Sequence, residues 1–473
     1  MNRVATGIPG LDQVLMGGFN RGNAILVEGT PGAGKTNLGL QVVYAGATLH
    51  DEPGLIVTFE QFSHQMIRDA ESLGWDLQAL VDSGKVRIIP TSPAVFQQEM
   101  AGSDGLIADI VREMGAQRIV IDSVSHFARL YGDDAERREV FNALVNMLRR
   151  SGLTALLTRE VRLRAGSGAS EEVSFEQYVS DAALRLTYEN VDATRRARYL
   201  EVIKARGQGF LPGKHLFEIG QGGLTVYPSY DPGELKGEPS NGPLERLSTG
   251  VPGLDEMLSG GLHRSFTTLV TGPSGVGKTV IGLQFLADGM KAGEPALYTS
   301  FRSGPGKLVR LARALEIPLA TEEGGHIRFD CPHPAMMNPY RVLEDIIQAA
   351  EDEGISRVVI DSTREIEDAF RDEARYDQFV YTLVHRLYTC GVTTMLLGGP
   401  GKTEEPSAPA STSIGAIVDS IIGLCHVSTR GDIRQGIYVL KSPGSAHVND
   451  IRPYSIATGG LKVATRRVTV WDD

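Results

Sequence analysis

The sequence predicts an α/β protein of two tandem domains, each with a mainly parallel β-sheet flanked by helices. Two observations carry this prediction. Segment 6–36 recurs without a gap at 249–279 with about half of its positions identical, and a copy displaced by half of a 473-residue chain indicates two homologous domains rather than a solenoid. Within each copy, short and almost continuously apolar runs alternate with longer helical patterns, which is typical of strands covered on both faces.

The elements of the first copy follow a repeated strand–helix order. Strands are expected at Ala24–Glu28, Leu55–Phe59, Val86–Ile89, Arg118–Ile121 and Thr154–Leu157, and helices at Lys35–Leu49, Ser63–Leu73, Leu106–Met114 and Ala135–Arg150. The two copies stay in step, because Arg118–Ser123 reads R-I-V-I-D-S and Arg357–Ser362 reads R-V-V-I-D-S. A polar stretch rich in Pro and Gly, 229–245, is expected to link a domain of residues 1–228 to one of residues 246–473.

Composition narrows the class of protein. Hydrophobic residues make up 41% and charged residues 22%, which excludes a disordered or fibrous chain. The net charge of −11 argues against a nucleic acid or an anionic membrane as partner. No apolar run approaches the roughly 18 residues of a membrane span, no apolar leader begins the chain, and the three cysteines are far apart. We therefore expect a cytoplasmic protein that binds no membrane.

Two glycine-rich loops predict two ATP sites. Each has the pattern G-x4-G-K-T between an apolar strand and a helix. In such a loop backbone N–H groups surround the β-phosphate, the lysine spans the β- and γ-phosphates, and the threonine hydroxyl ligates Mg²⁺. The residues expected to bind ATP are Gly29, Thr30, Pro31, Gly32, Ala33, Gly34, Lys35, Thr36 and Asn37 in the first domain, and Gly272, Pro273, Ser274, Gly275, Val276, Gly277, Lys278, Thr279 and Val280 in the second.

An aspartate closes the same apolar strand in both copies. Asp122 and Asp361 each follow an isoleucine and precede a serine. We expect both to hold Mg²⁺, mostly through water, together with Thr36 and Thr279. The alternative is an ordinary strand-end aspartate that caps a turn or helix.

The two copies differ where the chemistry is decided. The strand after the first loop ends in Thr-Phe-Glu60-Gln61, and its counterpart ends in Ser-Phe-Arg302-Ser303. A carboxylate at this place polarises the water that attacks the γ-phosphate. Glu60 is therefore expected to be the catalytic base beside Lys35, whereas Arg302 cannot accept a proton. The alternative for Glu60 is a surface glutamate at a strand end.

At these residues the chain resembles the KaiC family of double RecA-like ATPases, over nearly its whole length. The resemblance extends to Thr6–Asp12, Ser72–Leu77, Tyr178–Asp181 and Lys204–Gly207. It implies two tandem RecA-like P-loop domains, ATP and Mg²⁺ as cofactors, and a homohexamer of two stacked rings with ATP between neighbouring subunits. It also implies a KaiB-like protein partner on the first ring.

The same resemblance assigns further site residues. Lys204 and Arg206, with Ala205 between them, would reach the γ-phosphate of a neighbouring subunit in the trans arginine role. From the residues alone, the alternative interpretation of the K-x-R-G motif is an exposed basic turn. Ser72 would lie near the nucleoside, and Lys441 would be the trans lysine of the second domain, where Pro443 replaces the arginine.

The chain departs from the autokinase members of that family. Their second ring uses paired glutamates, which here are Arg302 and Ser303, and the phosphoacceptor positions align with Gly415 and Ala416, which carry no hydroxyl. In the first site the second glutamate of the family is Gln61. The chain ends at Asp473, so no tail partner of the KaiA type is expected.

The leading interpretation is a slow ATPase whose first ring hydrolyses ATP and whose second ring is a structural nucleotide clamp. One alternative is a Ser/Thr autokinase acting on Ser411, Thr412 or Ser413. Another is a RecA-like protein that uses ATP only to assemble or to bind single strands, with basic patches at 162–168 and 195–198.

Overall fold

The chain forms two compact units, Met1–Asp231 and Pro232–Asp473, which we call the first and the second domain. The computed structural model describes residues 3–100, 105–129, 133–161, 174–190, 195–229, 245–319, 327–333, 337–370, 372–399, 413–429, 432–444, 447–448 and 450–464. The linker predicted at 229–245 lies almost wholly outside these residues, so the boundaries placed at 228 and 246 stay predictions.

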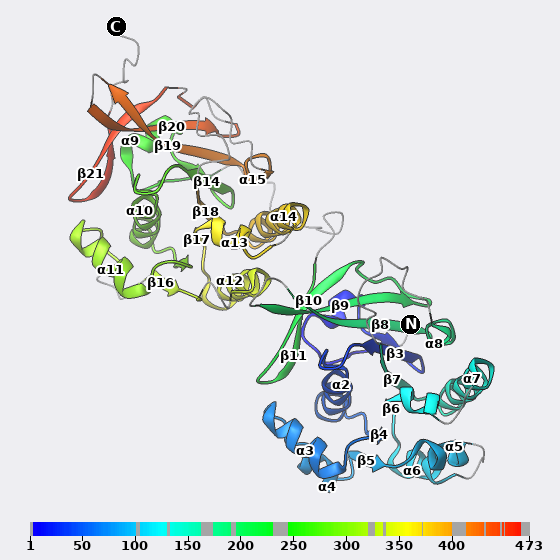
Figure 1. The fold of residues 1–473 in the computed structure, drawn as a ribbon. Helices are drawn as coiled ribbons and strands as arrows, with labels where there is room; N and C mark the ends of the chain where they lie inside the picture. The colour runs from blue at the N-terminus through cyan, green and yellow to red at the C-terminus, as the bar shows by residue number, and fades with distance from the viewer. Residues whose placement is uncertain are drawn as a thin grey trace. The chain divides into compact units, whose positions relative to one another are not determined.

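The described residues of the first domain form a nine-stranded sheet with helices on both faces, together with a two-stranded sheet of β1 and β2 (Figure 1). The strand order of the nine-stranded sheet is β11-β10-β9-β8-β3-β7-β6-β4-β5; β8 to β5 in this order run parallel, and β9 to β11 are antiparallel additions. The elements are β1 (Arg3–Val4), α1 (Leu11–Val14), β2 (Phe19–Asn20), β3 (Ala24–Gly29), α2 (Lys35–Leu49), β4 (Gly54–Thr58), α3 (Ser63–Ser72), α4 (Leu77–Asp82), β5 (Val86–Pro90), α5 (Pro93–Met100), α6 (Leu106–Met114), β6 (Arg118–Asp122), η1 (Val124–Arg129), α7 (Asp134–Arg150), β7 (Thr154–Glu160), α8 (Phe175–Val179), β8 (Ala182–Asn190), β9 (Arg196–Ala205), β10 (Lys214–Gly220) and β11 (Gly223–Tyr227).

The second domain repeats this architecture with the strand order β16-β15-β17-β18-β14-β19-β20-β21-β22. Its elements are β12 (Arg246–Leu247), α9 (Pro252–Met257), β13 (Leu262–His263), β14 (Thr267–Thr271), α10 (Lys278–Lys291), β15 (Ala296–Ser300), α11 (Pro305–Ala314), β16 (Ile327–Asp330), α12 (Pro339–Glu353), β17 (Arg357–Asp361), α13 (Thr363–Glu367), α14 (Glu373–Thr389), β18 (Thr393–Gly398), α15 (Ser413–Ile417), β19 (Ser420–Thr429), β20 (Asp432–Lys441), β21 (Arg452–Ala457) and β22 (Gly460–Val463). The predicted fold class is thus confirmed in both domains.

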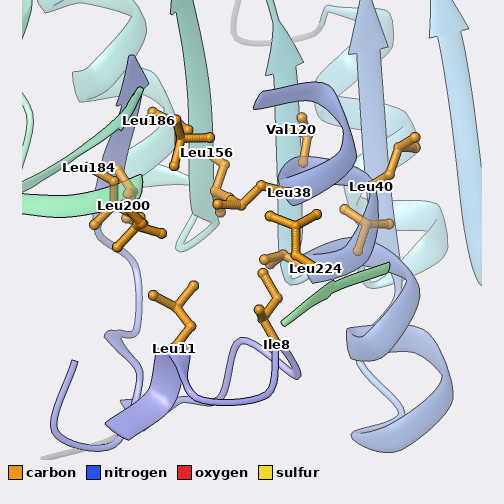
Figure 2. Packing of buried hydrophobic residues seen from close by; sticks show 14 of the residues in the cluster. Ile8, Leu11, Leu38, Leu40, Val120, Leu156, Leu184, Leu186, Leu200 and Leu224 are labelled. Atoms are coloured by element: carbon orange, nitrogen blue, oxygen red, sulfur yellow. The ribbon is translucent and has the colours of Figure 1, made fainter. Parts of the chain in front are cut away.

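The pleat of each strand divides its apolar side chains between two cores. On β3, Ile25 and Val27 join the core that contains α2, whereas Ala24 and Leu26 join the core that contains α6 and α7. Figure 2 shows the first of these cores, in which side chains of α2, of the sheet and of the N-terminal segment gather, among them Leu38, Leu156 and Leu11. Burial on both faces explains the almost continuous apolar runs of the parallel strands.

The predicted elements of the first domain all form, with ends displaced by at most a few residues. Strand β8 and the antiparallel strands β9 to β11 were not among them. On β9 only Leu200 and Val202 are buried, and most of the other residues are partly exposed. These strands matter for the site, because they extend the sheet beyond the phosphate loop and carry Lys204 and Arg206.

The N-terminal motif T-G-I-P-G-L-D has a structural role. The backbone N–H of Thr6 donates to Asp12 Oδ1 at 2.8 Å, and that of Ile8 donates to Thr6 Oγ1 at 3.1 Å. Gly10 has φ 77°, and a Cβ there would come within 1.9 Å of the carbonyl oxygen of Val226. The motif therefore fixes a tight turn against β11, which requires glycine.

A buried ion pair ties the sheet of each domain to its central helix. Arg118 is 1% exposed; its guanidinium contacts Glu52 at 2.6 Å and donates to the carbonyl oxygen of Val42 on α2 at 2.9 Å. A Cβ at Gly46 would come within 2.5 Å of this guanidinium, so glycine makes room for it. The second domain repeats the arrangement with Arg357 paired to Glu294, beside Gly289.

None of the helices within the described ranges is long and apolar enough to cross a membrane.

Glu52→Ala is expected to destabilise the first domain by about 3 kcal/mol or more, because it leaves the Arg118 guanidinium buried without its partner. Urea unfolding of the full chain in a Trp471→Phe background measures this, since Trp75 then remains as the fluorophore among the chain's two tryptophans. The control is Lys85→Ala, which breaks the exposed Lys85–Asp51 pair and should cost less than about 1 kcal/mol. Equal effects of the two variants would contradict the prediction.

Candidate functional site

The first glycine-rich loop joins β3 to α2 at the carboxyl edge of the parallel strands. Gly32 has φ 76° and Gly34 has φ 100°, in the left-handed region that favours glycine. A Cβ on Gly29 would come within 2.3 Å of the carbonyl oxygen of Leu186, so this position also requires glycine. The backbone therefore turns tightly before the first turn of α2, as a phosphate-binding loop requires.

Lys35 begins α2, and its ammonium group folds back over this loop. Nζ donates to two carbonyl oxygens of the loop, both at 3.0 Å. Burial lowers the pKa of Lys35, while the negative charges of Glu160, Asp122 and Glu60 act in the opposite direction. The cation predicted to bind phosphate thus lies among three carboxylates that belong to three different strands or strand ends.

Thr36 and Asp122 meet as the predicted magnesium pair. Thr36 Oγ1 donates to Asp122 Oδ2 at 2.7 Å, and the hydroxyl of Thr158 on β7 donates to the other oxygen, Oδ1. The peptide bond from Asp122 to Ser123 is cis, as is its counterpart in the second domain. A hydroxyl and a carboxylate side by side at a phosphate loop are oxygen donors suited to hydrated Mg²⁺, so the residues fit the metal.

The second glycine-rich loop has the same geometry. Lys278 Nζ donates to the carbonyl oxygens of Gly272 at 2.5 Å and Pro273 at 2.8 Å. Thr279 Oγ1 donates to Asp361 Oδ2 at 3.0 Å. Burial lowers the pKa of Lys278, the charge of Asp361 opposes this, and the positive charge of Arg302 lowers it further.

The two domains hold their strand-end aspartates by different partners. In the second domain the hydroxyl of Tyr298 on β15 donates to Asp361 Oδ2 at 2.8 Å. Tyr298 is fully buried, and burial together with the charge of Asp361 raises its pKa well above the ordinary value. The strand registers place Ile56 at the position of Tyr298, and Leu397 at the position of Thr158. The hydroxyl that donates to the strand-end aspartate therefore lies on β7 in the first domain and on β15, the equivalent of β4, in the second.

Glu60 contacts a histidine that the sequence analysis missed. His126 Nε2 lies 2.7 Å from Glu60 Oε1; the side chain of His126 is 9% exposed and that of Glu60 is 59% exposed. Backbone contacts fix the segment, because the N–H of Phe59 donates to the carbonyl oxygen of Asp122 at 3.0 Å. Glu60 thus lies next to the aspartate–threonine pair with one carboxylate oxygen engaged by a buried ring.

At the equivalent place of the second domain the charges are reversed. Arg302 Nε donates to Glu365 Oε1, and the hydroxyl of Ser362 donates to Glu365 Oε2. Burial raises the pKa of Glu365, but the hydrogen bonds from Ser362 and Arg302 outweigh it and hold this pKa below its usual value. Arg302 therefore lies in an ion pair, and a carboxylate occupies the position of His126.

Two more charged residues of the first domain approach its loop without having been predicted as site residues. Glu160 ends β7 opposite Gly29, and its counterpart in the second domain is Gly399. Arg198, which the sequence analysis placed in a basic patch at 195–198, has Nε 3.4 Å from the carbonyl oxygen of Gly32. Its counterpart in the second domain is Gln435. Strand pairing, which a sequence pattern does not give, brings both to the loop.

Lys204, Ala205 and Arg206 lie at the opposite end of the sheet from their own loop. Ala205 pairs with Ala182, which pairs with Ile25 at the start of β3. Gly29 follows four residues later, roughly 13 Å along the strand. Lys204 Nζ donates to Ser180 O at 2.5 Å and Arg206 donates to Tyr178 O at 2.7 Å. Burial, with the charge of Arg206, lowers the pKa of Lys204.

Lys441 repeats this placement in the second domain. It pairs with Ile421 near the start of β19, and its Nζ donates to the carbonyl oxygen of Val418 at 2.6 Å. The carbonyl oxygen of Pro443 lies 3.0 Å from Nε2 of His263. A turn bound to β13 thus stands where the first domain carries Arg206.

The other predicted residues are placed as follows. Ser72 ends α3, where its hydroxyl donates to Asp69 O at 2.6 Å, so its predicted position near a nucleoside stays a prediction. Asn37 is half-buried in the first turn of α2, and the side chain of Val280 packs into the core of the second domain. The basic patch at 162–168, Ser411, Thr412 and the side chain of Ser413 lie outside what the structure describes.

Comparisons with known proteins match both halves of the chain to one family. A family model described as "ATPase: KaiC" matches the chain twice, at residues 4–231 and 247–468. The circadian clock oscillator protein KaiC of Picosynechococcus is 33% identical, over 98% of this chain and 90% of its own length. That of Rippkaea orientalis is 34% identical over 97% and 88%, and the circadian clock oscillator protein KaiC 1 of Synechocystis is 33% identical over the same shares.

Each loop lysine is expected to serve one nucleotide. The unaltered chain should bind two molecules of a non-hydrolysable ATP analogue, and Lys35→Ala or Lys278→Ala should each bind one, because the remaining loop keeps its geometry. Equilibrium dialysis with Mg²⁺ measures this stoichiometry. Lys85→Ala, at an exposed lysine, is the control and should still bind two. Two nucleotides on either loop variant would contradict the assignment.

Proposed function

The chain belongs to the KaiC family of ATPases, with two RecA-like domains, and we propose that it hydrolyses ATP slowly in its first domain while its second domain holds ATP as a structural clamp. One observation carries the proposal. At the same place beside the loop, the first domain has the carboxylate of Glu60 and the second has the guanidinium of Arg302. Only the carboxylate can accept a proton from water.

The first site supports an in-line attack of water on the γ-phosphate. Glu60 takes a proton from the water while the water oxygen bonds to phosphorus. The bond from phosphorus to the oxygen that bridges to the β-phosphate breaks, and its electron pair leaves with ADP. The products are ADP and inorganic phosphate. Lys35 neutralises charge on the phosphates, and Thr36 with Asp122 would hold Mg²⁺, which supplies further neutralisation when bound.

The composition of the first site supports slow turnover. The family pattern has a second glutamate beside the base, which here is Gln61. Its amide donates to Asp69 at 3.3 Å and cannot act as a proton acceptor. A single base without a second acid supports a low rate.

The second site supports binding without turnover. Its loop, lysine and aspartate–threonine pair match those of the first site. Its buried carboxylate, Glu365, is held by Arg302 and Ser362, and its lowered pKa makes it a weak proton acceptor. By the family resemblance, Gly415 and Ala416 of α15 would align with the phosphoacceptors of the autokinases, and neither residue carries a hydroxyl. The proposal therefore assigns no kinase activity to this domain.

The trans residues support assembly of several copies. Lys204 and Arg206 lie roughly 13 Å along the strand direction from their own loop, so they cannot complete that site themselves. A neighbouring copy that presents this end of its sheet to the loop supplies the missing positive charge. We propose the homohexameric double ring of the family, formed in ATP. A cytoplasmic location and a KaiB-like protein partner on the first ring stay predictions.

Glu60→Gln is expected to lower phosphate release at least about 100-fold and to leave ATP binding unchanged, because it removes the proton acceptor but keeps the side-chain shape. Steady-state phosphate release and analogue binding measure the two effects. The control is Glu71→Gln, an exposed glutamate of α3, which should behave as the unaltered chain does. Turnover that survives Glu60→Gln would remove the proposed base.

Mixed oligomers test the trans role. Arg206→Ala and Lys35→Ala are each expected to lose turnover alone. Mixing them should restore part of it, because one interface then joins an intact loop of the first variant to an intact Arg206 of the second. Phosphate release after co-assembly measures the rescue, with Arg206→Ala mixed with Glu60→Gln/Arg206→Ala as the matched control. An absence of rescue in oligomers of confirmed mixed composition would place Arg206 outside the site.

A further inference from the structure

We propose that His126 is a positioning residue for Glu60: its Nε2–H holds one carboxylate oxygen so that the other faces the attacking water. The inference rests on the proposed function of Glu60 and deepens it. The contact joins residues 66 positions apart in the chain, at 2.7 Å from His126 Nε2 to Glu60 Oε1. An ionised carboxylate only accepts hydrogen bonds, so the imidazole is the donor.

The side chains of Glu60 and His126 differ in conformational freedom. A glutamate side chain with 59% of its surface exposed samples many rotamers in water. The imidazole does not, because it is 9% exposed and its ring packs edge-on against Phe59, with centroids 6.1 Å apart. Phe59 itself contacts Phe96 and Phe127. A hydrogen bond from a ring held in an aromatic cluster therefore restricts the carboxylate more than any contact of Glu60 with solvent.

This orientation of Glu60 leaves one carboxylate oxygen available to accept a proton from water. Once Oε1 is engaged by His126, Oε2 remains to take the proton of water. His126 follows Asp122 by four residues, in the short helix η1, so one segment carries both the magnesium aspartate and the residue that orients the base. Thr158 Oγ1 and Thr36 Oγ1 fix that aspartate. The positions of metal ligand and base are thereby set relative to each other.

The second domain shows that this contact belongs to the fold. Thr58 pairs with Asp122 in the first domain, and Ser300 pairs with Asp361 in the second. Counted from these pairs, Arg302 has the position of Glu60, and Glu365 has the position of His126. They also form a hydrogen-bonded pair, with the acid and the base exchanged. Because the contact persists when both residue types change, the residue four positions beyond the end of β6, or of β17 in the second domain, sets the orientation of the side chain that follows β4 or β15.

The experiment compares His126→Leu, which removes the donor, with His126→Gln, whose amide N–H reaches the place of Nε2. We expect the turnover number at saturating ATP to fall about tenfold in His126→Leu and to recover most of its value in His126→Gln. The affinity for the non-hydrolysable analogue and the oligomer mass in ATP should match those of the unaltered chain. Equal losses in the Leu and Gln variants, or no loss in Leu, would overturn the inference.

A double-mutant cycle separates positioning from packing. If His126 acts through Glu60, His126→Leu lowers single-turnover phosphate release no further in a Glu60→Gln background. A further tenfold loss there would show a role apart from Glu60 and overturn the inference. If His126→Leu fails to fold, His126→Asn replaces it, because its shorter amide falls short of Glu60; Asn as active as Gln would then contradict the positioning role.

The same variants distinguish a failure of the positioning role of His126 from a failure of the proposed ATPase function. Unimpaired hydrolysis by Glu60→Gln would remove the base itself, and the proposed function would fail with the inference that rests on it. An inactive Glu60→Gln together with a fully active His126→Leu would leave the function standing and remove only the positioning role.

Discussion

The parallel pairing of β4 with β6 sets Thr58 opposite Asp122, and the first site depends on this register. From it, Glu60 two residues beyond β4 and His126 four residues beyond β6 come within a hydrogen bond of each other. The pairing of β3 with β7 adds Glu160 opposite Gly29 at the same edge. A slip of one residue in either pair would displace these side chains relative to one another and break the contacts of the site.

The two domains keep this register and change the side chains on it. The backbone of Phe301 donates to Asp361 as that of Phe59 does to Asp122, and both loops fold over their lysines alike. The exchanged positions are Glu60 to Arg302, His126 to Glu365, Thr158 to Leu397, Ile56 to Tyr298 and Glu160 to Gly399. The aspartate keeps a supporting hydroxyl, from Thr158 in the first domain and from Tyr298 in the second, so this part of the site persists while the proton chemistry beside it differs.

Local sequence signals were enough to predict the phosphate loops, their helices and the strand-end aspartates. Those signals are continuous in the chain: glycines that require positive φ, an apolar strand before them and a helix after. The partnership of His126 with Glu60 carries no such signal, because a histidine in a buried 3₁₀ turn has no periodicity, and only the β4–β6 pairing brings the two together. The antiparallel strands were missed because they lack a continuous apolar run: most residues of β9, for example, are only partly buried.

The antiparallel strands give each domain two chemically distinct ends. The loop, the hydrogen-bonded pair of Thr36 and Asp122, and the proposed base gather at the carboxyl edge of the parallel strands. Lys204 and Arg206 lie where β9 ends, near the start of β3. Under the proposed trans role, one copy must present the second end to the first end of another. Such a contact joins different surfaces, so it repeats from copy to copy and either closes into a ring or continues as a filament. A closed ring completes every site, because no copy is left with an unfilled loop, and this favours the ring over an open chain of copies.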